Sequence, residues 1–226
     1  MKNTILLKTA LFLSSLLVFL IACATPSPPL VPAGEEDYEY LKEYMEWYIE
    51  KEMKNNDLVG LSVALLDENE VVWAGNFGMA DKASDRQVDE NTIFKMGSLS
   101  KVFTATAVMQ LVEQGLVDLD NPITVYIPEF TYKTRFEVTN AITVRNLMTH
   151  HSGLQGDFRK GMMGSEYIPN NFRTTVSLYR DLYAAFPPEQ VHAYNNMSVA
   201  LLGIIIERVS GLDFAEYMKK KILIPL

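Results

Sequence analysis

The chain contains a single cysteine, Cys23, which stands at the end of the first apolar run and not in the body of the sequence. No disulfide can form within one copy of the chain, so its folded part must be held together by packing alone. The composition permits this, because the 226 residues are 48% hydrophobic and 21% charged, the balance of an ordinary folded domain. We therefore expect a globular body with a sizeable hydrophobic core.

The charge balance is acidic and excludes one class of partner. Lys and Arg number 20 against 28 Asp and Glu, which gives a net charge of −8. Lys2 and Lys8 are the only charged side chains before Cys23, so the rest of the chain is more acidic still. Such a body lacks the positive field that neutralises phosphates, and we expect no nucleic acid partner.

The first 22 residues have the form of an export signal. Lys2 precedes an apolar run from Ile5 to Ala22, as in a secretory signal peptide. The run ends in Leu-Ile-Ala-Cys, which resembles the bacterial lipobox and implies that the thiol of Cys23 carries a lipid. A plain signal peptide and an uncleaved membrane anchor are the alternatives.

These residues set the predicted organisation of the chain. Residues 1–22 form a lipoprotein signal peptide, 23–34 a lipidated cysteine with a Pro-rich tether, and 35–226 the folded domain. We expect an exported bacterial lipoprotein at the periplasmic or extracellular face of a membrane, bound to the lipid bilayer through Cys23. Ala24, directly after the cysteine, resembles an outer-membrane sorting residue.

Hydrophobic periodicity predicts a mixture of helices and strands after residue 35. Apolar residues recur at helical spacing up to Met53, and the runs 60–66 and 71–75 predict a hairpin about the four-residue turn Asp67 to Glu70. Further helices are expected over 98–114, from 143, over 198–209 and over 214–222. The stretch 155–183 has no clear period, and we assign no element there.

Ser98 and Lys101 form the first candidate for chemistry. The sequence Ser98-Leu99-Ser100-Lys101 places a hydroxyl at the start of a helix and an amine one turn on, on the same face. An amine can activate a serine nucleophile only when neutral, which requires lowering a lysine pKa of about 10.4 by about 3.4 units for half to be neutral at pH 7. Chance predicts about 0.7 such matches in this composition, and a helix N-cap serine explains the tetrapeptide equally well.

Three strings in fixed order decide between these interpretations. They are Thr92-Ile93-Phe94-Lys95-Met96-Gly97-Ser98-Leu99-Ser100-Lys101, Ile142-Thr143-Val144-Arg145-Asn146-Leu147-Met148-Thr149-His150-His151-Ser152-Gly153-Leu154 and Tyr194-Asn195-Asn196. From residue 59 to 226 the chain resembles the serine β-lactamase and penicillin-binding-protein-like family, in the branch of class C β-lactamases, D-alanyl-D-alanine carboxypeptidases and esterases. This resemblance implies an α+β fold of the β-lactamase/transpeptidase type, an antiparallel sheet flanked by helices plus a helical subdomain.

The resemblance also implies a role for each site residue. Ser98 would be the acylated nucleophile, and its backbone N–H half of an oxyanion hole. Lys101 would take or share its proton, Tyr194 would be the second proton-handling group, and Asn196 would hold the substrate amide. The family uses no cofactor or metal here, and His150, His151 and His192 make a poor metal site because two are adjacent and one is distant.

One family motif is missing from its usual place. Relatives carry Lys or His, Thr or Ser, then Gly on a strand downstream of the Tyr-x-Asn motif, whereas no such string follows Tyr194. His151-Ser152-Gly153 spells the motif upstream, and we interpret it as a turn. We therefore expect residues 35–226 to be the N-terminal two-thirds of the domain, with the C-terminal strands missing from this chain.

The functional hypothesis is an exported serine hydrolase that forms an acyl-enzyme on an amide or ester. Its substrate would be a small molecule or peptide, namely a β-lactam, a D-amino-acid peptide or a small ester, and we expect a monomer. The alternative is a catalytically inactive fragment or a non-catalytic relative of the same fold.

Overall fold

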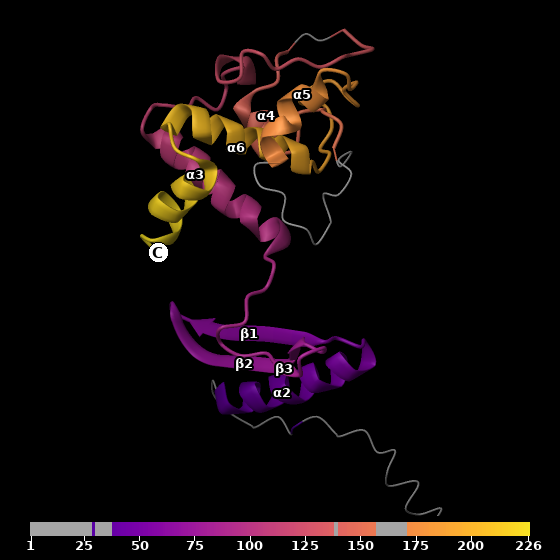
Figure 1. Cartoon of the computed structure of the whole chain (residues 1–226), viewed down its shortest axis with the longest axis vertical. Helices are drawn as coiled ribbons and strands as arrows, with labels where there is room; N and C mark the ends of the chain where they lie inside the picture. Colours follow the sequence, from indigo (N-terminus) through magenta and orange to yellow (C-terminus); the bar gives the residue numbers. More distant parts are fainter. Residues whose placement is uncertain (1–28, 30–37, 138–139, 157–170) are drawn as a thin grey trace, which may run out of the picture. The chain divides into compact units, whose positions relative to one another are not determined.

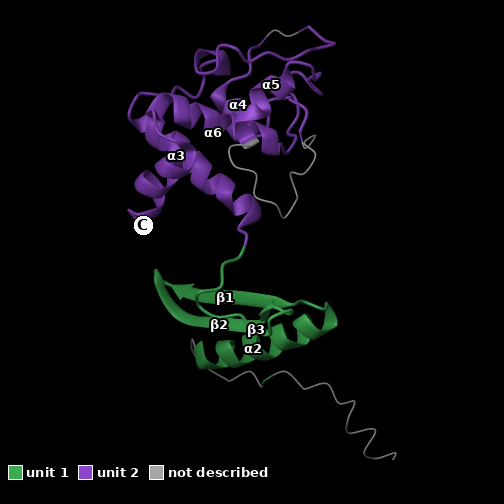
Figure 2. Ribbon diagram, viewed as in Figure 1, with its two compact units in different colours: residues 1–94 green, residues 95–226 purple. Residues whose placement is uncertain are grey.

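The computed structural model describes residues 29, 38–137, 140–156 and 171–226, and the chain divides into two compact units, residues 1–94 and 95–226 (Figure 2). The predicted signal peptide, Cys23 and nearly all of the tether lie outside the described residues. Within the described part, no helix combines the length and the apolar character that crossing a bilayer requires.

The first unit joins one long helix to a small antiparallel sheet (Figure 1). Helix α2 spans Tyr38–Asn55, and the strands β1 (Gly60–Asp67), β2 (Glu70–Asp81) and β3 (Arg86–Gln87) pair in the order β1-β2-β3. Both the helix and the hairpin agree with the sequence prediction. The short third strand lies in a segment for which the sequence predicts no element.

The hairpin turn is tighter than predicted. Asp67 and Glu70 pair across the strands, so the loop is the dipeptide Glu68-Asn69 and not four residues. Both loop residues have positive φ, 43° and 73°, the conformation of a two-residue turn whose twist matches that of the flanking strands. The prediction of a four-residue turn is wrong because polar side chains on paired strand ends look the same in the sequence as polar side chains in a loop.

The second unit is helical. Its longer helices are α3 (Ser100–Glu113) and α6 (Asn196–Ser210), and each is followed by a glycine with positive φ, Gly115 at 71° and Gly211 at 72°. Shorter elements complete it: η1 (Gly97–Leu99), η2 (Ile123–Val125), α4 (Val144–Met148), η3 (Asn171–Thr174), α5 (Thr175–Tyr179), α7 (Phe214–Tyr217) and the π-helical turn η4 (Met218–Leu223). With the sheet of the first unit, the chain has the predicted α+β character.

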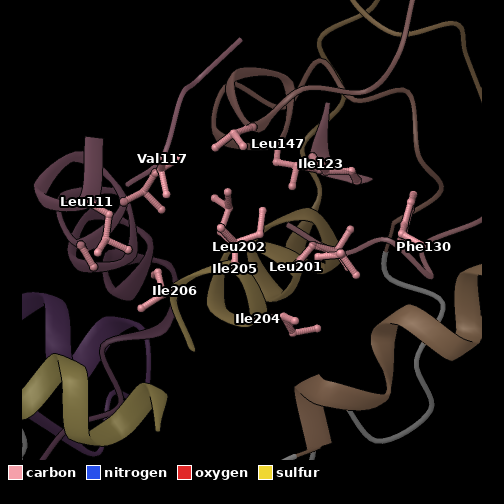
Figure 3. Close-up of a cluster of buried hydrophobic side chains, with 14 of the residues drawn as sticks. Leu111, Val117, Ile123, Phe130, Leu147, Leu201, Leu202, Ile204, Ile205 and Ile206 are labelled. Atoms are coloured by element: carbon pink, nitrogen blue, oxygen red, sulfur yellow. The ribbon is translucent and has the colours of Figure 1, made fainter. Parts of the chain in front are cut away.

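Helix α6 forms the centre of the core in this unit. Leu201, Leu202, Ile205 and Ile206 are almost fully buried, and Figure 3 shows them facing side chains from α3, η2 and α4. Leu111 and Leu147 are among those neighbours. Because α6 begins at Asn196, the packing of this helix fixes where the Tyr-x-Asn string lies.

Charged pairs attach the neighbouring segments to α6. Arg173 Nε donates to Glu207 at 2.8 Å, and a second nitrogen of Arg173 bonds both Glu207 and, at 2.6 Å, Asp213. Arg208 forms a two-pronged pair with Glu129 and holds the pKa of that carboxyl down to about 2. These pairs link η3, α7 and the segment after η2 to the same helix.

Candidate active site

Ser98 lies in the 3-10 turn η1, directly before α3. The helix therefore begins two residues later than the sequence predicts, because the N–H of Ser100 and its hydroxyl both bond back to Gly97 O. Neither η1 nor α3 has a side chain capping its N-terminus. The alternative interpretation of Ser98 as an N-cap is therefore wrong, and its exposed hydroxyl is available for other contacts.

The hydroxyl of Ser98 lies between two polar groups. Lys101 Nζ donates to Ser98 Oγ at 3.1 Å, and Ser98 Oγ shares a hydrogen bond with the Tyr194 hydroxyl at 2.5 Å. Lys101 Nζ also lies 4.7 Å from the centroid of the Tyr194 ring. The structure thus brings together three of the predicted site residues, although 96 residues separate Ser98 from Tyr194.

Tyr194 is held by the start of α6. The next residue, Asn195, is only 1% exposed, and its side chain accepts from the N–H of Ser198 and donates to Leu154 O. It is therefore the N-cap of α6 and at the same time a link to the segment after α4. Tyr194 lies just outside the helix, which directs its hydroxyl toward Ser98 and leaves 48% of the residue exposed.

Asn196 is the first residue of α6 and lies beside the same site. Together with Lys101 it borders a cavity of about 260 Å³. The apolar part of the cavity lining includes Phe172, Gly203 and Phe214. The fourth predicted residue thus lies beside Lys101 at the edge of this cavity.

The three histidines, of which two are adjacent in sequence and one is distant, lie together beside Tyr194. His150 lies 4.6 Å from Tyr194 and 5.9 Å from His192 between ring centroids, and His151 lies 5.2 Å from His192. Burial, and then the charges of His192, Lys101 and His151, lower the pKa of His150. Among the described residues, no group of three or more His, Cys, Asp or Glu side chains is arranged so that it could hold a metal ion. The spacing along the chain gave no sign of this cluster.

The string His151-Ser152-Gly153 lies at a bend that follows α4. None of its residues belongs to a strand, Ser152 is buried with its hydroxyl 3.0 Å from that of Ser198, and Gly153 has a φ of 68°. A Cβ at Gly153 would lie 2.1 Å from Phe186 O, so the close approach of the two segments requires glycine.

A family model described as beta-lactamase matches residues 45–226, which is most of the chain. The chain belongs to the beta-lactamase family. This family comprises serine hydrolases named as β-lactamases, penicillin-binding proteins and esterases, in agreement with the resemblance drawn from the motifs.

Three members of the beta-lactamase family illustrate the similarity. A penicillin-binding protein of Bacillus subtilis is 28% identical over 73% of this chain and 36% of its own length. The esterase EstB of Burkholderia gladioli is 27% identical over 84% of this chain and 51% of its own length. The solved structure of an octameric penicillin-binding protein homologue from Pyrococcus abyssi is 33% identical, with a TM-score of 0.71 over 80% of this chain and 42% of that one.

The chain thus spans between about a third and a half of the length of these relatives.

Proposed function

We propose that Ser98 is the nucleophile of an acyl-transfer reaction on an amide or ester substrate. The observation that carries this proposal is the position of Ser98 Oγ, within hydrogen-bonding distance of both Lys101 Nζ and the Tyr194 hydroxyl. A serine hydroxyl needs an adjacent base to become a useful nucleophile, and two proton-handling groups reach this one.

The reaction would proceed in two balanced steps. Ser98 Oγ attacks the carbonyl carbon while its proton passes to the pair Lys101 and Tyr194. The bond from that carbon to the leaving nitrogen or oxygen then breaks, and the pair returns the proton to the leaving group. Water, losing a proton to the same pair, then attacks the carbonyl carbon of the Ser98 ester. The bond from that carbon to Ser98 Oγ breaks, the carboxylic acid leaves, and the pair returns the proton to Ser98 Oγ.

Other groups near Ser98 would bind the substrate. Ser98 stands at the start of a helical segment, where backbone N–H groups have no partner within the helix and favour a developing oxyanion. Asn196 would hold the substrate amide. The apolar cavity beside it would accept the part of the acyl group that adjoins the carbonyl.

The substrate class and the cellular location complete the proposal. The candidates are a β-lactam, a D-amino-acid peptide and a small ester, which correspond to the kinds of protein named among the relatives. The residues before Cys23 and the cysteine itself support export and a lipid anchor, so the enzyme would act at a membrane surface, as a monomer.

Intact mass spectrometry of the full chain tests the nucleophile. The chain is exposed separately to a fluorophosphonate and to a β-lactam, beside the variants Ser98→Ala and Ser100→Ala. We expect an adduct on the wild type and on Ser100→Ala, and none on Ser98→Ala. An adduct that survives Ser98→Ala would reject Ser98 as the nucleophile, and no adduct on a wild type that unfolds cooperatively would reject the proposal in favour of the inactive fragment.

A further inference from the structure

His150 holds the chain on both sides of Tyr194. Its carbonyl oxygen accepts the N–H of Ala193 at 2.8 Å, and its ring Nδ1 accepts the N–H of Asn195 at 3.2 Å. Its ring lies 4.6 Å from the Tyr194 ring, between centroids, at an angle of 44°. The residues before and after Tyr194 are therefore both hydrogen-bonded to His150, which lies in a distant part of the sequence.

The backbone of His150 is itself in an unusual conformation. Its φ is 61°, in the left-handed region that non-glycine residues seldom adopt. Next to it, His151 O accepts the N–H of Glu189, and His151 N–H donates to Asn146 O, so the surrounding bonds hold the conformation in place. This conformation lets the carbonyl and the ring of one residue reach both Ala193 and Asn195.

We propose that His150 is a positioning residue that, in its neutral form, holds the Tyr194 hydroxyl on Ser98, and that a proton on its Nδ1 releases this hold. The kinetic part rests on the proposed function, whereas the structural part does not. An Nδ1 that accepts an N–H must carry its lone pair, so the ring proton is on Nε2. Protonation turns this acceptor into a donor that faces the donor N–H of Asn195.

The surroundings of His150 determine where on the pH scale the release occurs. Among the described residues, the titratable groups that face the ring are Tyr194, Lys101, His151 and His192. Lys101 and the two imidazoles repel a proton on His150, and burial does so too, which lowers its pKa. His150 is therefore neutral at pH 7, and the site would loosen only at acid pH, below the ordinary histidine pKa.

Two substitutions of His150 distinguish the role of its hydrogen-bond acceptor from the role of its ring. In His150→Asn, the side-chain oxygen stands close to the position of Nδ1, cannot titrate, and belongs to a residue that tolerates positive φ. In His150→Phe, the ring remains beside Tyr194 but the acceptor is lost. His192→Asn is the matched control, because it removes a neighbouring imidazole without touching the bond to Asn195.

The first readout is the rate at which a fluorophosphonate acylates the full chain between pH 4 and 8. We expect a wild-type rate that falls at acid pH, and a His150→Asn rate within about threefold of wild type at pH 7 that lacks this fall. His150→Phe should be about tenfold slower or more at every pH. His192→Asn should keep the fall and move its midpoint to higher pH. A wild-type acid profile in His150→Asn, or a wild-type rate in His150→Phe, would overturn the proposal.

The second readout needs no reaction. In NMR spectra of the wild-type chain, the Asn195 amide and the Tyr194 ring should shift with the same midpoint as the His150 ring protons. If they do not move with His150, the proposal is wrong whatever the kinetics show. A wild type that is inert to the reagent at every pH would count against the proposed function alone, and this titration would still decide the role of His150.

Discussion

Replacing Tyr194 by Phe tests the site most directly, because it deletes one oxygen and leaves the ring. That oxygen is 2.5 Å from Ser98 Oγ, so the variant loses one of the two groups that reach the nucleophile, while Lys101 stays at 3.1 Å. A positioned acid or base typically contributes about 10² to 10⁴ in rate. Since one such group remains, we expect a loss near the lower end, about 10²-fold, or about 2.7 kcal/mol in the barrier.

The same substitution should leave the fold intact. Tyr194 is 48% exposed and Ser98 is exposed, so no buried polar group loses its partner. The ring contacts with His150 and Lys101 do not depend on the hydroxyl. We therefore expect the free energy of unfolding to fall by less than about 1 kcal/mol. A structural role would instead lower stability and reactivity together.

The assay is the second-order rate of acylation by a fluorophosphonate, with urea unfolding measured on the same samples. Lys101→Met and the double variant complete a double-mutant cycle. Because both groups serve one proton transfer, the double variant should lose less than the product of the single losses. A Tyr194→Phe rate within about threefold of wild type, or fully multiplicative losses, would refute a shared role in moving the proton.

Three further predictions concern the stability of the helical unit. Leu201→Ala should lower the free energy of unfolding by about 2–5 kcal/mol in urea, because the side chain is fully buried in the centre of the core; a loss under about 1 kcal/mol would contradict that placement. Glu207→Gln should cost about 1–2 kcal/mol in the same assay, since it weakens charge-assisted bonds to Arg173 at a carboxylate that is only 15% exposed; no loss would mean the pair is broken in solution. Glu129, whose pKa is lowered to about 2 from 4.5 chiefly by hydrogen bonds from Arg208, should stabilise the fold above about pH 5 and lose that contribution as the pH falls toward 2. Because both partners are more than a third exposed, the effect should be about 1 kcal/mol; a Glu129→Gln variant should lack this part of the pH dependence, and an unchanged profile would argue against the pair.

The sequence predicted the elements whose ends carry a local signal. Gly115 and Gly211 mark the ends of α3 and α6 because their positive φ values suit a residue without a Cβ. Thr143 marks the start of α4, where its side chain accepts from the N–H of Asn146, and the side chain of Asn146 accepts in return. Within such boundaries, helical periodicity suffices to place a helix.

Features that depend on distant contacts could not be predicted. The Glu68-Asn69 turn depends on the register of β1 against β2, which polar residues do not specify. His150 and Tyr194 are 44 residues apart in sequence, and the packing of α4 against α6 brings them together. The adjacency of His150 to His151 in the sequence therefore gave no information about this contact. The resemblance to a known family predicted that Ser98, Lys101, Tyr194 and Asn196 belong to one site. The structure adds the distances from Ser98 Oγ to Lys101 Nζ and to the Tyr194 hydroxyl.

The N-cap of α6 makes the middle position of the Tyr-x-Asn string selective. The side-chain oxygen of Asn195 accepts from the N–H of Ser198 in the helix, and its side-chain nitrogen donates to Leu154 O. The residue is only 1% exposed, so both groups need these partners. Aspartate could do only the first, and serine is too short to span both. In a library randomised at this position, asparagine should therefore dominate the sequences that retain activity, even though its side chain never reaches the nucleophile.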